Sequence, residues 1–390
     1  MEVKVRRSSM NFALIFVINL LVSIGFHILN PTLPKYILSI GIATGSAGLI
    51  STAFVVSSLI IRPMAGRWNN RRNLLKRLLM IGLFCLLAAT VGYVFSGNIA
   101  MLVLCRLIHG LGWGISTTTA ATIAAMSVPE NRLGSGIGIF GLASCISNAV
   151  APNLGLWLCS GGQYTRLFVA GALIPAVCIA LAVFIVIPRE EEKPRAAGRI
   201  SVTDFFSARC LVPMLMILLL SVSVASVSHF LALYAEDLQI AGIGLFFTVY
   251  AVSLFVSKPM SGRASDRFGF AAVVCVCAVL MMIAFGLISA AQNLWMFIVA
   301  AVFYGVGYGG IQPALQAWCF RRETKERKGV ASSTFFIGLD AGTGIGATAA
   351  GFVAQYLSYR QMYMVMILPI ALCILVYFIS ARKENEHEKA

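Results

Sequence analysis

Residues 62–71 read Arg-Pro-Met-Ala-Gly-Arg-Trp-Asn-Asn-Arg, and residues 258–267 read Lys-Pro-Met-Ser-Gly-Arg-Ala-Ser-Asp-Arg. These stretches lie 196 positions apart, and each follows an apolar run. A second pair of motifs, His-Gly-Leu-Gly-Trp-Gly at 109–114 and Tyr-Gly-Val-Gly-Tyr-Gly at 304–309, repeats at an offset of 195. Self-similarity at one period indicates a repeated structural unit. The sequence therefore predicts two halves built on one plan.

The rest of the chain is dominated by apolar segments. Of its 390 residues, 59% are hydrophobic and 12% are charged, whereas soluble globular domains contain about 25% charged residues. A membrane-spanning helix needs about 20 mostly apolar residues, and runs of this length recur throughout the sequence. We predict twelve spanning helices, at residues 11–32, 44–62, 76–96, 99–126, 134–158, 165–187, 210–234, 242–258, 271–291, 294–319, 330–356 and 361–381.

The positive charge of the chain predicts its orientation in the membrane. The net charge is +15, and Lys and Arg are retained on the cytoplasmic side. With the N-terminus in the cytoplasm, cytoplasmic segments hold 26 of the 30 basic residues and the outside holds 3, while Arg106 falls inside a span. Both termini are therefore predicted to be cytoplasmic. The same bias accounts for the charge without a nucleic-acid partner.

The longest polar connection divides the predicted helices into two sets of six. It runs from Pro188 to Arg209. We predict an all-α membrane protein with an N-terminal half at 1–187, a cytoplasmic linker at 188–209 and a C-terminal half at 210–390. Transporters with repeated halves hold their substrate near the bilayer midplane, so a transporter is the expected class.

Signatures of enzymes, nucleotide sites and metal sites are absent from the sequence. No Gly-Lys pair occurs, which excludes a P-loop, and we expect neither an enzyme nor a bound cofactor. The ten cysteines lie in or beside apolar segments, where cysteine behaves as a small hydrophobic residue. Cys275 and Cys277 are two residues apart, which places them on different faces of a helix, so no metal site is expected.

Two six-helix halves with a Gly-x-x-x-Asp-Arg-x-Gly loop motif resemble the major facilitator superfamily, especially its twelve-helix drug:proton antiporter branch. The motif is complete in the second half and ends at Gly269, whereas Asn70 and Asn73 replace its acid and last glycine in the first half. Asn70 can still accept a hydrogen bond from a helix N-terminus, and Asn73 tolerates a left-handed backbone. The resemblance implies a cytoplasmic gate formed by Gly66, Arg67, Asn70, Arg71, Gly262, Arg263, Asp266 and Arg267. The alternative is that the arginines only retain these loops in the cytoplasm.

Two further motifs are similar to those of the antiporter branch. Arg106, followed by Gly110 and Gly112, matches a motif whose arginine is linked to proton transfer, and a buried arginine in a membrane normally faces a polar interior. The alternatives are a role in substrate binding and a structural hydrogen bond to the first helix. The fifth segment ends with Ala151, Pro152 and Gly155, similar to the Gly-Pro-x-Leu-Gly motif of exporters. The resemblance therefore implies outward transport.

Asp340 is the carboxylate that falls inside a predicted span. A charged carboxylate in a bilayer is disfavoured unless it is paired, so a residue there is suited to binding and releasing protons. We predict that Asp340 and Arg106 couple transport to protons. The alternatives for Asp340 are a counter-ion for the substrate and a hydrogen-bonded packing residue.

Polar and aromatic residues in the central helices are the candidates for a substrate cavity. Each of them could instead form a hydrogen bond between helices. They are Asn19, His27, Asn30, His109, Trp113, His229, Tyr234, Tyr304, Tyr308, Gln312 and Gln316.

The predicted function is secondary active transport in the plasma, or inner, membrane by a monomer. Its partners are a small-molecule substrate, protons and membrane lipid. We predict a proton-coupled exporter of small amphiphilic or drug-like molecules, driven by the proton gradient alone. The alternative is a transporter of one metabolite, such as a sugar, an amino-acid derivative or a metallophore. A sensor without transport activity is disfavoured by the short loops.

Overall fold

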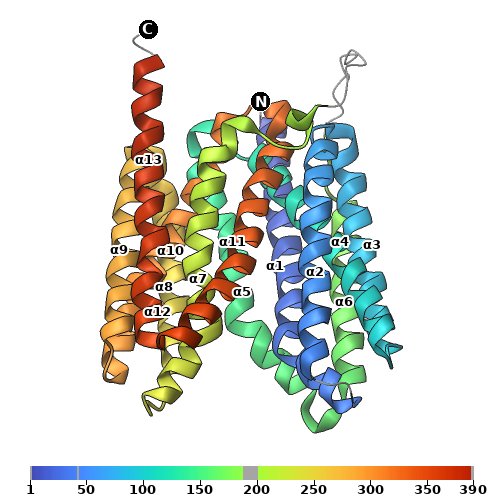
Figure 1. The fold of residues 1–390 in the computed structure, drawn as a ribbon. Coiled ribbons are helices and arrows are strands. Elements are labelled where there is room, and N and C mark those ends of the chain that lie inside the picture. Colours follow the sequence, from blue (N-terminus) through green and yellow to red (C-terminus); the bar gives the residue numbers. More distant parts are fainter. Residues whose placement is uncertain (1, 42–43, 188–200, 388–390) are drawn as a thin grey trace. The chain divides into compact units, whose positions relative to one another are not determined.

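The computed structural model describes residues 2–41, 44–187 and 201–387, and these residues form helices and short connections (Figure 1). The helices are α1 (Glu2–Ser39), α2 (Thr44–Asn69), α3 (Arg72–Val94), α4 (Ile99–Ser127), α5 (Leu133–Leu158), α6 (Tyr164–Val183), α7 (Leu211–Asp237), α8 (Gly244–Phe268), α9 (Phe270–Ala290), α10 (Leu294–Arg322), α11 (Lys328–Tyr356), α12 (Tyr359–Val365) and α13 (Ile367–His387).

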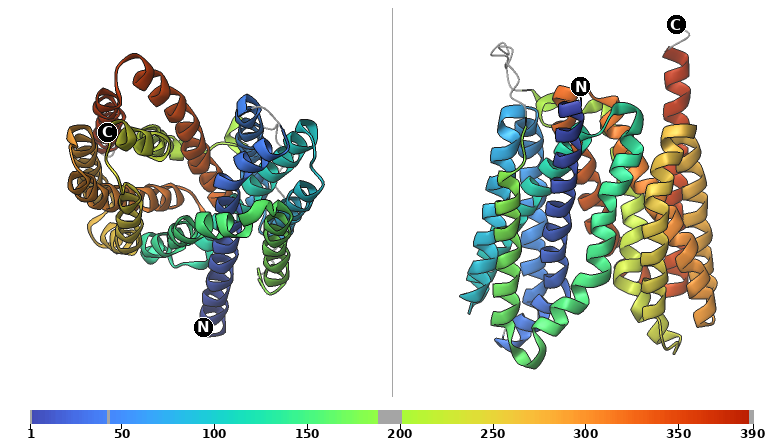
Figure 2. Two further views of the ribbon diagram at one scale, coloured as in Figure 1. Left: turned by 90° about the horizontal axis from the view of Figure 1, so that it is seen from below. Right: turned by 180° about the vertical axis from the view of Figure 1, so that it is seen from behind.

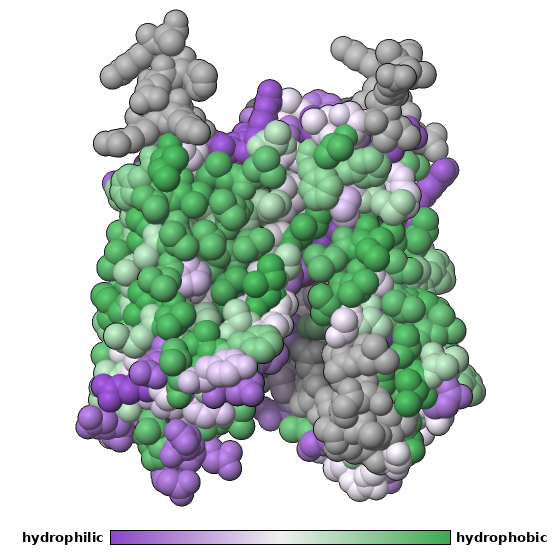
Figure 3. All heavy atoms as spheres, viewed as in Figure 1, coloured by the Kyte–Doolittle hydropathy of each residue, from purple (hydrophilic) through white to green (hydrophobic). Residues whose placement is uncertain are grey.

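The all-helical prediction is confirmed within these residues. Among the described residues, eleven segments are long and apolar enough to cross a membrane. The predicted span at 44–62 is helical, as part of α2, but it is not one of the eleven. On the face shown in Figure 3, hydrophobic side chains cover most of the length of the helices, and hydrophilic ones gather toward the helix ends. The count of twelve spans and the cytoplasmic termini stay predictions.

Several predicted helix ends are wrong. Helices α2 and α8 continue through Pro63 and Pro259 to Asn69 and Phe268, so much of each basic motif is helical rather than loop. Helix α2 can continue past the charged Arg62, because this side chain donates hydrogen bonds to Thr117 and Thr118 in α4. Lys258 likewise donates to the Gly141 carbonyl oxygen at 3.1 Å.

The last predicted helix is two helices. Helix α12 ends at Val365 and α13 begins at Ile367. Pro369 explains the break, because proline lacks an N–H and its ring clashes with the carbonyl four residues earlier, which is that of Val365. Helix α6 also ends earlier than predicted, at Val183 rather than 187.

The helices form two compact units. Unit 1 comprises residues 1–129, 143–207 and 323–334, and unit 2 comprises residues 130–142, 208–322 and 335–390. The first turns of α5 thus belong to unit 2, and the first turns of α11 belong to unit 1. The boundaries predicted from the sequence follow the polar linker instead, and residues 188–200 of that linker lie outside the described residues.

In unit 1, α4 packs between α2 and α3, and α6 packs against α3 and α1 (Figures 1 and 2). The glycine motif of α4 makes these contacts close. A Cβ atom on Gly110 would meet the Ser57 side chain of α2, and one on Gly112 would lie 2.8 Å from the Gly82 oxygen of α3.

Unit 2 repeats this packing, with α10 between α8 and α9. A Cβ atom on Gly305 would lie 2.5 Å from the Ser253 side chain of α8, and one on Gly307 would lie 2.8 Å from the Cys277 oxygen of α9. The duplicated glycine motifs therefore form the two helix crossings of each unit, which supports the reading of the sequence as a repeat.

Gly112→Val is expected to lower the stability of the fold. The added side chain would overlap the α3 backbone, and overpacking of this kind costs about 1–3 kcal/mol or more. Gly171→Ala in α6 is the matched control, because nothing lies within 4 Å of a Cβ atom built there. Yield of monodisperse protein and its thermal unfolding measure the difference. Equal behaviour of the two variants would contradict a close α3–α4 crossing.

Candidate functional site

Asp266, in the last turn of α8, caps the N-terminus of α5 within unit 2. Its Oδ1 accepts a hydrogen bond from the Gly134 N–H at 2.9 Å, and its Oδ2 accepts from the N–H and Oγ of Ser135 at 2.8 and 2.7 Å. The first N–H groups of a helix lack partners within the helix and carry partial positive charge. A carboxylate is well suited to this position. Arg321 adds an ion pair to Asp266 at 3.0 Å.

Asn70 has the equivalent position in unit 1. It lies in the turn between α2 and α3, and its Oδ1 accepts a hydrogen bond from the Val330 N–H of α11 at 3.2 Å. The Ser332 hydroxyl of α11 also donates to the Thr118 carbonyl oxygen of α4 at 3.2 Å. The first-half motif therefore keeps the cap without its charge. Asn73 is the second residue of α3, so it does not use the left-handed backbone considered from the sequence.

Close approach of glycines accompanies each cap. A Cβ atom on Gly66 of α2 would lie 2.6 Å from the Ser333 Cβ of α11, and one on Gly134 of α5 would lie 2.6 Å from the Gly262 oxygen of α8. Gly262 is the counterpart of Gly66 at the offset of 196, and Gly329 is the counterpart of Gly134 at the offset of 195, so the two caps share one geometry.

The predicted gate arginines do not form the ion pair of this site. Arg67 lies over the Phe205 ring at 5.0 Å, and Arg267 lies over Phe268 at 5.1 Å. Arg71 and Arg263 are exposed. Arg321 was missed by sequence reasoning, since nothing in the basic run that contains it distinguishes it from its neighbours.

Exchanging the carboxylate of Asp266 for an amide, and the amide of Asn70 for a carboxylate, is expected to shift thermal stability in opposite directions. Asp266→Asn is expected to lower thermal stability, because it removes the ion pair and weakens the interaction with the helix dipole, at about 0.5–1 kcal/mol. Asn70→Asp is expected to raise stability by a similar amount, because it places a charge at the α11 N-terminus. Thermal unfolding of the purified variants checks both, with Lys35→Gln, an exposed cation of α1, as the control. The caps would be refuted by shifts of the same sign for both exchanges.

Arg106 lies in a buried aromatic cluster of unit 1. Its side chain is 5% exposed and hydrogen-bonds to Tyr93 of α3, and its guanidinium lies 5.5 Å from the Phe54 ring centre of α2. Its Nε has no hydrogen-bond partner among the described residues. His109, 2% exposed, hydrogen-bonds to the Tyr93 hydroxyl at 3.2 Å. These contacts run to α2 and α3 rather than to the first helix.

The aromatic cluster continues from Phe54 to α1. Phe26 stacks on Phe54 and on Trp113, with ring centres 5.1 and 4.4 Å apart. His27 contacts the Ser147 hydroxyl of α5 at 2.8 Å. Unit 1 thus brings together three predicted cavity residues, His27, His109 and Trp113. Asn19 is half-buried on α1, and the Asn30 side chain lies outside the described residues.

A second aromatic cluster lies in unit 2. Tyr304, 1% exposed, packs against Tyr250 at 4.7 Å and against Tyr308 at 6.2 Å between ring centres. Tyr234 donates a hydrogen bond to the Ser289 carbonyl oxygen at 3.1 Å, which suits a packing role.

The other cavity candidates of unit 2 lie in different environments. His229 is exposed, Gln312 is half-buried, and Gln316 is buried with no hydrogen-bond partner for its Nε2 among the described residues.

Sequence reasoning missed Tyr93, Phe54 and Tyr250. The repeat could have found two of them, because Phe54 and Tyr250 correspond at the offset of 196 that relates the basic motifs. Tyr93 has no such signal, since its role depends on the neighbouring α4 residues.

Asp340 lies in the middle of α11 and is half-buried. On the same helix, Gly338, Gly342 and Gly346 contact the α7 backbone, where a Cβ on Gly338 would lie 2.5 Å from the Met214 oxygen. Residues two positions apart lie on nearly opposite faces of a helix. Asp340 therefore faces away from α7.

The fifth-segment motif lies in unit 1. Ala151 is buried and Pro152 is inside α5. A Cβ atom on Gly155 would lie 2.6 Å from the Ile28 oxygen of α1, so glycine allows a close α1–α5 contact here. Among the described residues, no group of three His, Cys, Asp or Glu side chains could hold a metal ion.

Comparison with known proteins matches nearly the whole chain. The Major Facilitator Superfamily model matches residues 15–242 and 214–390. The multi-drug resistance efflux pump PmrA homolog of Lactococcus lactis is 23% identical over 92% of this chain and 91% of its own length. The quinolone resistance protein NorA of Staphylococcus aureus is 23% identical over 91% and 93%.

A solved structure confirms the fold. The human organic anion transporter MFSD10 has a TM-score of 0.82 and 17% identity, covering 95% of this chain and 99% of that one. Together with the apolar helices, these likenesses identify an integral multi-pass protein of the plasma membrane. The chain belongs to the Major Facilitator Superfamily of transporters.

Proposed function

We propose that this protein is a proton-coupled exporter of small amphiphilic or drug-like molecules that works by alternating access. The observation that carries the coupling is Asp340, a half-buried carboxylate in the middle of an apolar helix on the face away from α7. One relative, aligned over 92% of this chain, is named as a multi-drug resistance efflux pump, and another, aligned over 91%, is named as a quinolone resistance protein. The proton gradient is the driving force, no cofactor takes part, and the monomer is the working unit.

The buried cluster in unit 1 suits aromatic or amphiphilic substrates. The Phe26 ring stacks on the rings of Phe54 and Trp113, and such aromatic surfaces bind apolar molecules without requiring one fixed orientation. Arg106 supplies positive charge beside them. We assign Arg106 to coupling, because its Nε has no hydrogen-bond partner among the described residues, and a buried cation favours a nearby negative charge.

The alternative function is transport of one metabolite. The polar network of Arg106, Tyr93 and His109 favours it, since buried groups that need directional hydrogen bonds discriminate strongly between substrates. A molecule bearing a carboxylate or a phosphate would complement the arginine. The human organic anion transporter is similar in fold. Under this alternative, we propose an anionic metabolite as the substrate.

Purified protein in proteoliposomes tests the two functions. A pH gradient is imposed across the bilayer, and uptake is measured for a panel of cationic, neutral and anionic fluorescent compounds. The proposal expects several unrelated compounds to be transported, each only while the gradient lasts. Transport of a single compound class would establish the alternative, and transport that ignores the gradient would refute proton coupling.

A further inference from the structure

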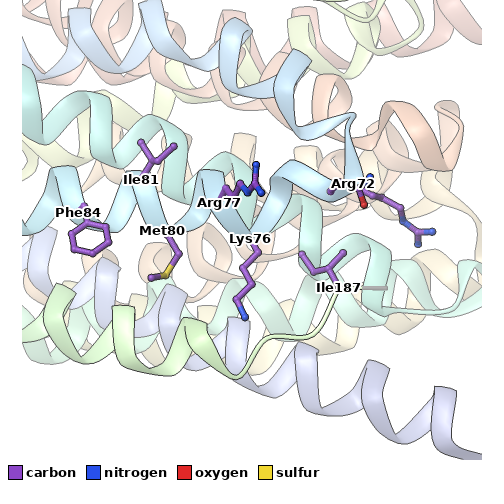
Figure 4. A pocket seen from close by; sticks show the side chains of 8 residues that line it. Arg72, Lys76, Arg77, Met80, Ile81, Phe84 and Ile187 are labelled. Carbon is purple, nitrogen blue, oxygen red and sulfur yellow. The ribbon is translucent and has the colours of Figure 1, made fainter. Parts of the chain in front are cut away.

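A groove of about 600 Å³ lies on the surface of unit 1 along the first half of α3 (Figure 4). One wall is α3 itself, and Ile187, on the chain that leaves α6, lies on the other side. None of the groups assigned to transport lines this groove, so it is a separate feature of the molecule.

The groove is polar at one end and apolar at the other. Along α3, positions four apart lie on one face. One such row runs from Arg72 and Lys76 to Met80 and Phe84, and the neighbouring row runs from Arg77 to Ile81. Each row therefore begins with cations and ends with apolar side chains. A helix rises 1.5 Å per residue, so the longer row, from Arg72 to Phe84, extends about 18 Å along the helix axis.

The cationic end is held in place by the protein. Lys76 donates a hydrogen bond to the Val183 carbonyl oxygen at the end of α6, at 2.6 Å, and it points from α3 toward α6 (Figure 4). An ammonium carries three N–H donors, so two remain beyond that bond. Arg77 is exposed at the groove, while Arg72 interacts electrostatically with Glu326.

The dimensions fit one leaflet of a membrane. The hydrocarbon core of a bilayer is about 30 Å thick, and half of it is close to the length of the longer row. With Arg72 and Arg77 at the membrane surface, Ile81 and Phe84 lie among the lipid chains, and both are about half exposed. Basic pockets beside membrane helices bind anionic headgroups.

We propose that this groove binds an anionic phospholipid, with its phosphate at Lys76 and Arg77 and an acyl chain along Met80, Ile81 and Phe84. Charge complementarity selects an anionic headgroup over a zwitterionic one. The apolar half of the groove selects a lipid over a soluble phosphate. The site does not depend on the proposed transport function.

Native mass spectrometry of delipidated protein in detergent tests the site. The protein is titrated with phosphatidylglycerol or phosphatidylcholine of identical acyl chains. We expect one phosphatidylglycerol to bind at least fivefold more tightly than phosphatidylcholine, since each cation at a membrane surface contributes about that factor. Arg77→Gln should remove most of the preference, and Lys76→Gln combined with Arg77→Gln should abolish it. Arg132→Gln, an exposed cation outside the groove, should retain it.

A groove-filling variant distinguishes lipid binding in the groove from attraction of lipid to general surface charge. Ile81→Trp keeps every cation and should weaken phosphatidylglycerol binding by occupying the apolar end. Glycerol phosphate should not compete at equal concentration. Equal binding of the two lipids, an Arg132→Gln effect as large as that of Arg77→Gln, or effective competition by glycerol phosphate would each overturn the proposal. Size-exclusion profiles identify variants that fail to fold, and Arg77→Gln alone avoids the Lys76 contact with α6.

Discussion

Asp340→Asn is expected to abolish export driven by a pH gradient and to leave the protein folded. The amide is nearly the same size as the carboxylate but cannot exchange a proton. Asp340 is half-buried on the α11 face away from the glycine contacts with α7, so the substitution leaves those contacts unchanged. Proteoliposome uptake under a pH gradient should fall to the level of protein-free vesicles.

Exchange measurements distinguish the roles that remain open for Asp340. If it carries the proton, the Asp340→Asn protein should still exchange labelled for unlabelled substrate without a gradient. If it is the counter-ion of the substrate, binding and exchange should both be lost. Unchanged gradient-driven uptake would assign it to packing and transfer the coupling proposal to Arg106. Asp340→Glu, which keeps the carboxylate, serves as the conservative control and should retain part of the coupled uptake.

Arg106→Gln is expected to reduce transport by about 10- to 100-fold. Loss of a buried charged hydrogen bond is worth about 1.5–3 kcal/mol, and each 1.4 kcal/mol corresponds to a factor of ten in rate. The substitution removes the cation over Phe54 and weakens the bond to Tyr93. Initial rates of uptake at saturating substrate, compared with binding affinity, measure the effect.

Two further variants show whether the charge or the network matters. Tyr93→Phe removes one hydroxyl from the network and should give a smaller loss than Arg106→Gln. Arg62→Lys is the matched control for a buried arginine, because lysine occupies the corresponding position 258 of the repeat, and it should be nearly neutral. Transport by Arg106→Gln at the native rate would show that the arginine only packs. A loss confined to anionic compounds would instead favour direct contact with the substrate.

Much of the fold could be predicted from local features of the sequence. Hydropathy and length locate apolar helices because each spanning helix must satisfy its backbone hydrogen bonds internally. The offsets of 195 and 196 revealed the repeat, and the paired glycine motifs do lie at equivalent helix crossings. Helix ends were predicted less well. Arg62 and Lys258 looked like helix ends but stay inside helices, because partners from α4 and α5 accept their hydrogen bonds.

The candidate site depended more strongly on tertiary structure. The sequence identified Asn70, Asp266, Arg106 and Asp340 as unusual by their charge, spacing or place within apolar runs.

The sequence alone did not reveal the hydrogen-bond partners of those residues. Asn70 bonds to a residue 260 positions away, and Asp266 bonds to one 132 positions away. Segments that are distant in the sequence also form the Arg321 ion pair, the ring contacts around Arg106 and the groove along α3. Spacing along a helix fixes which side chains share a face, but only the packing of distant helices decides what that face meets.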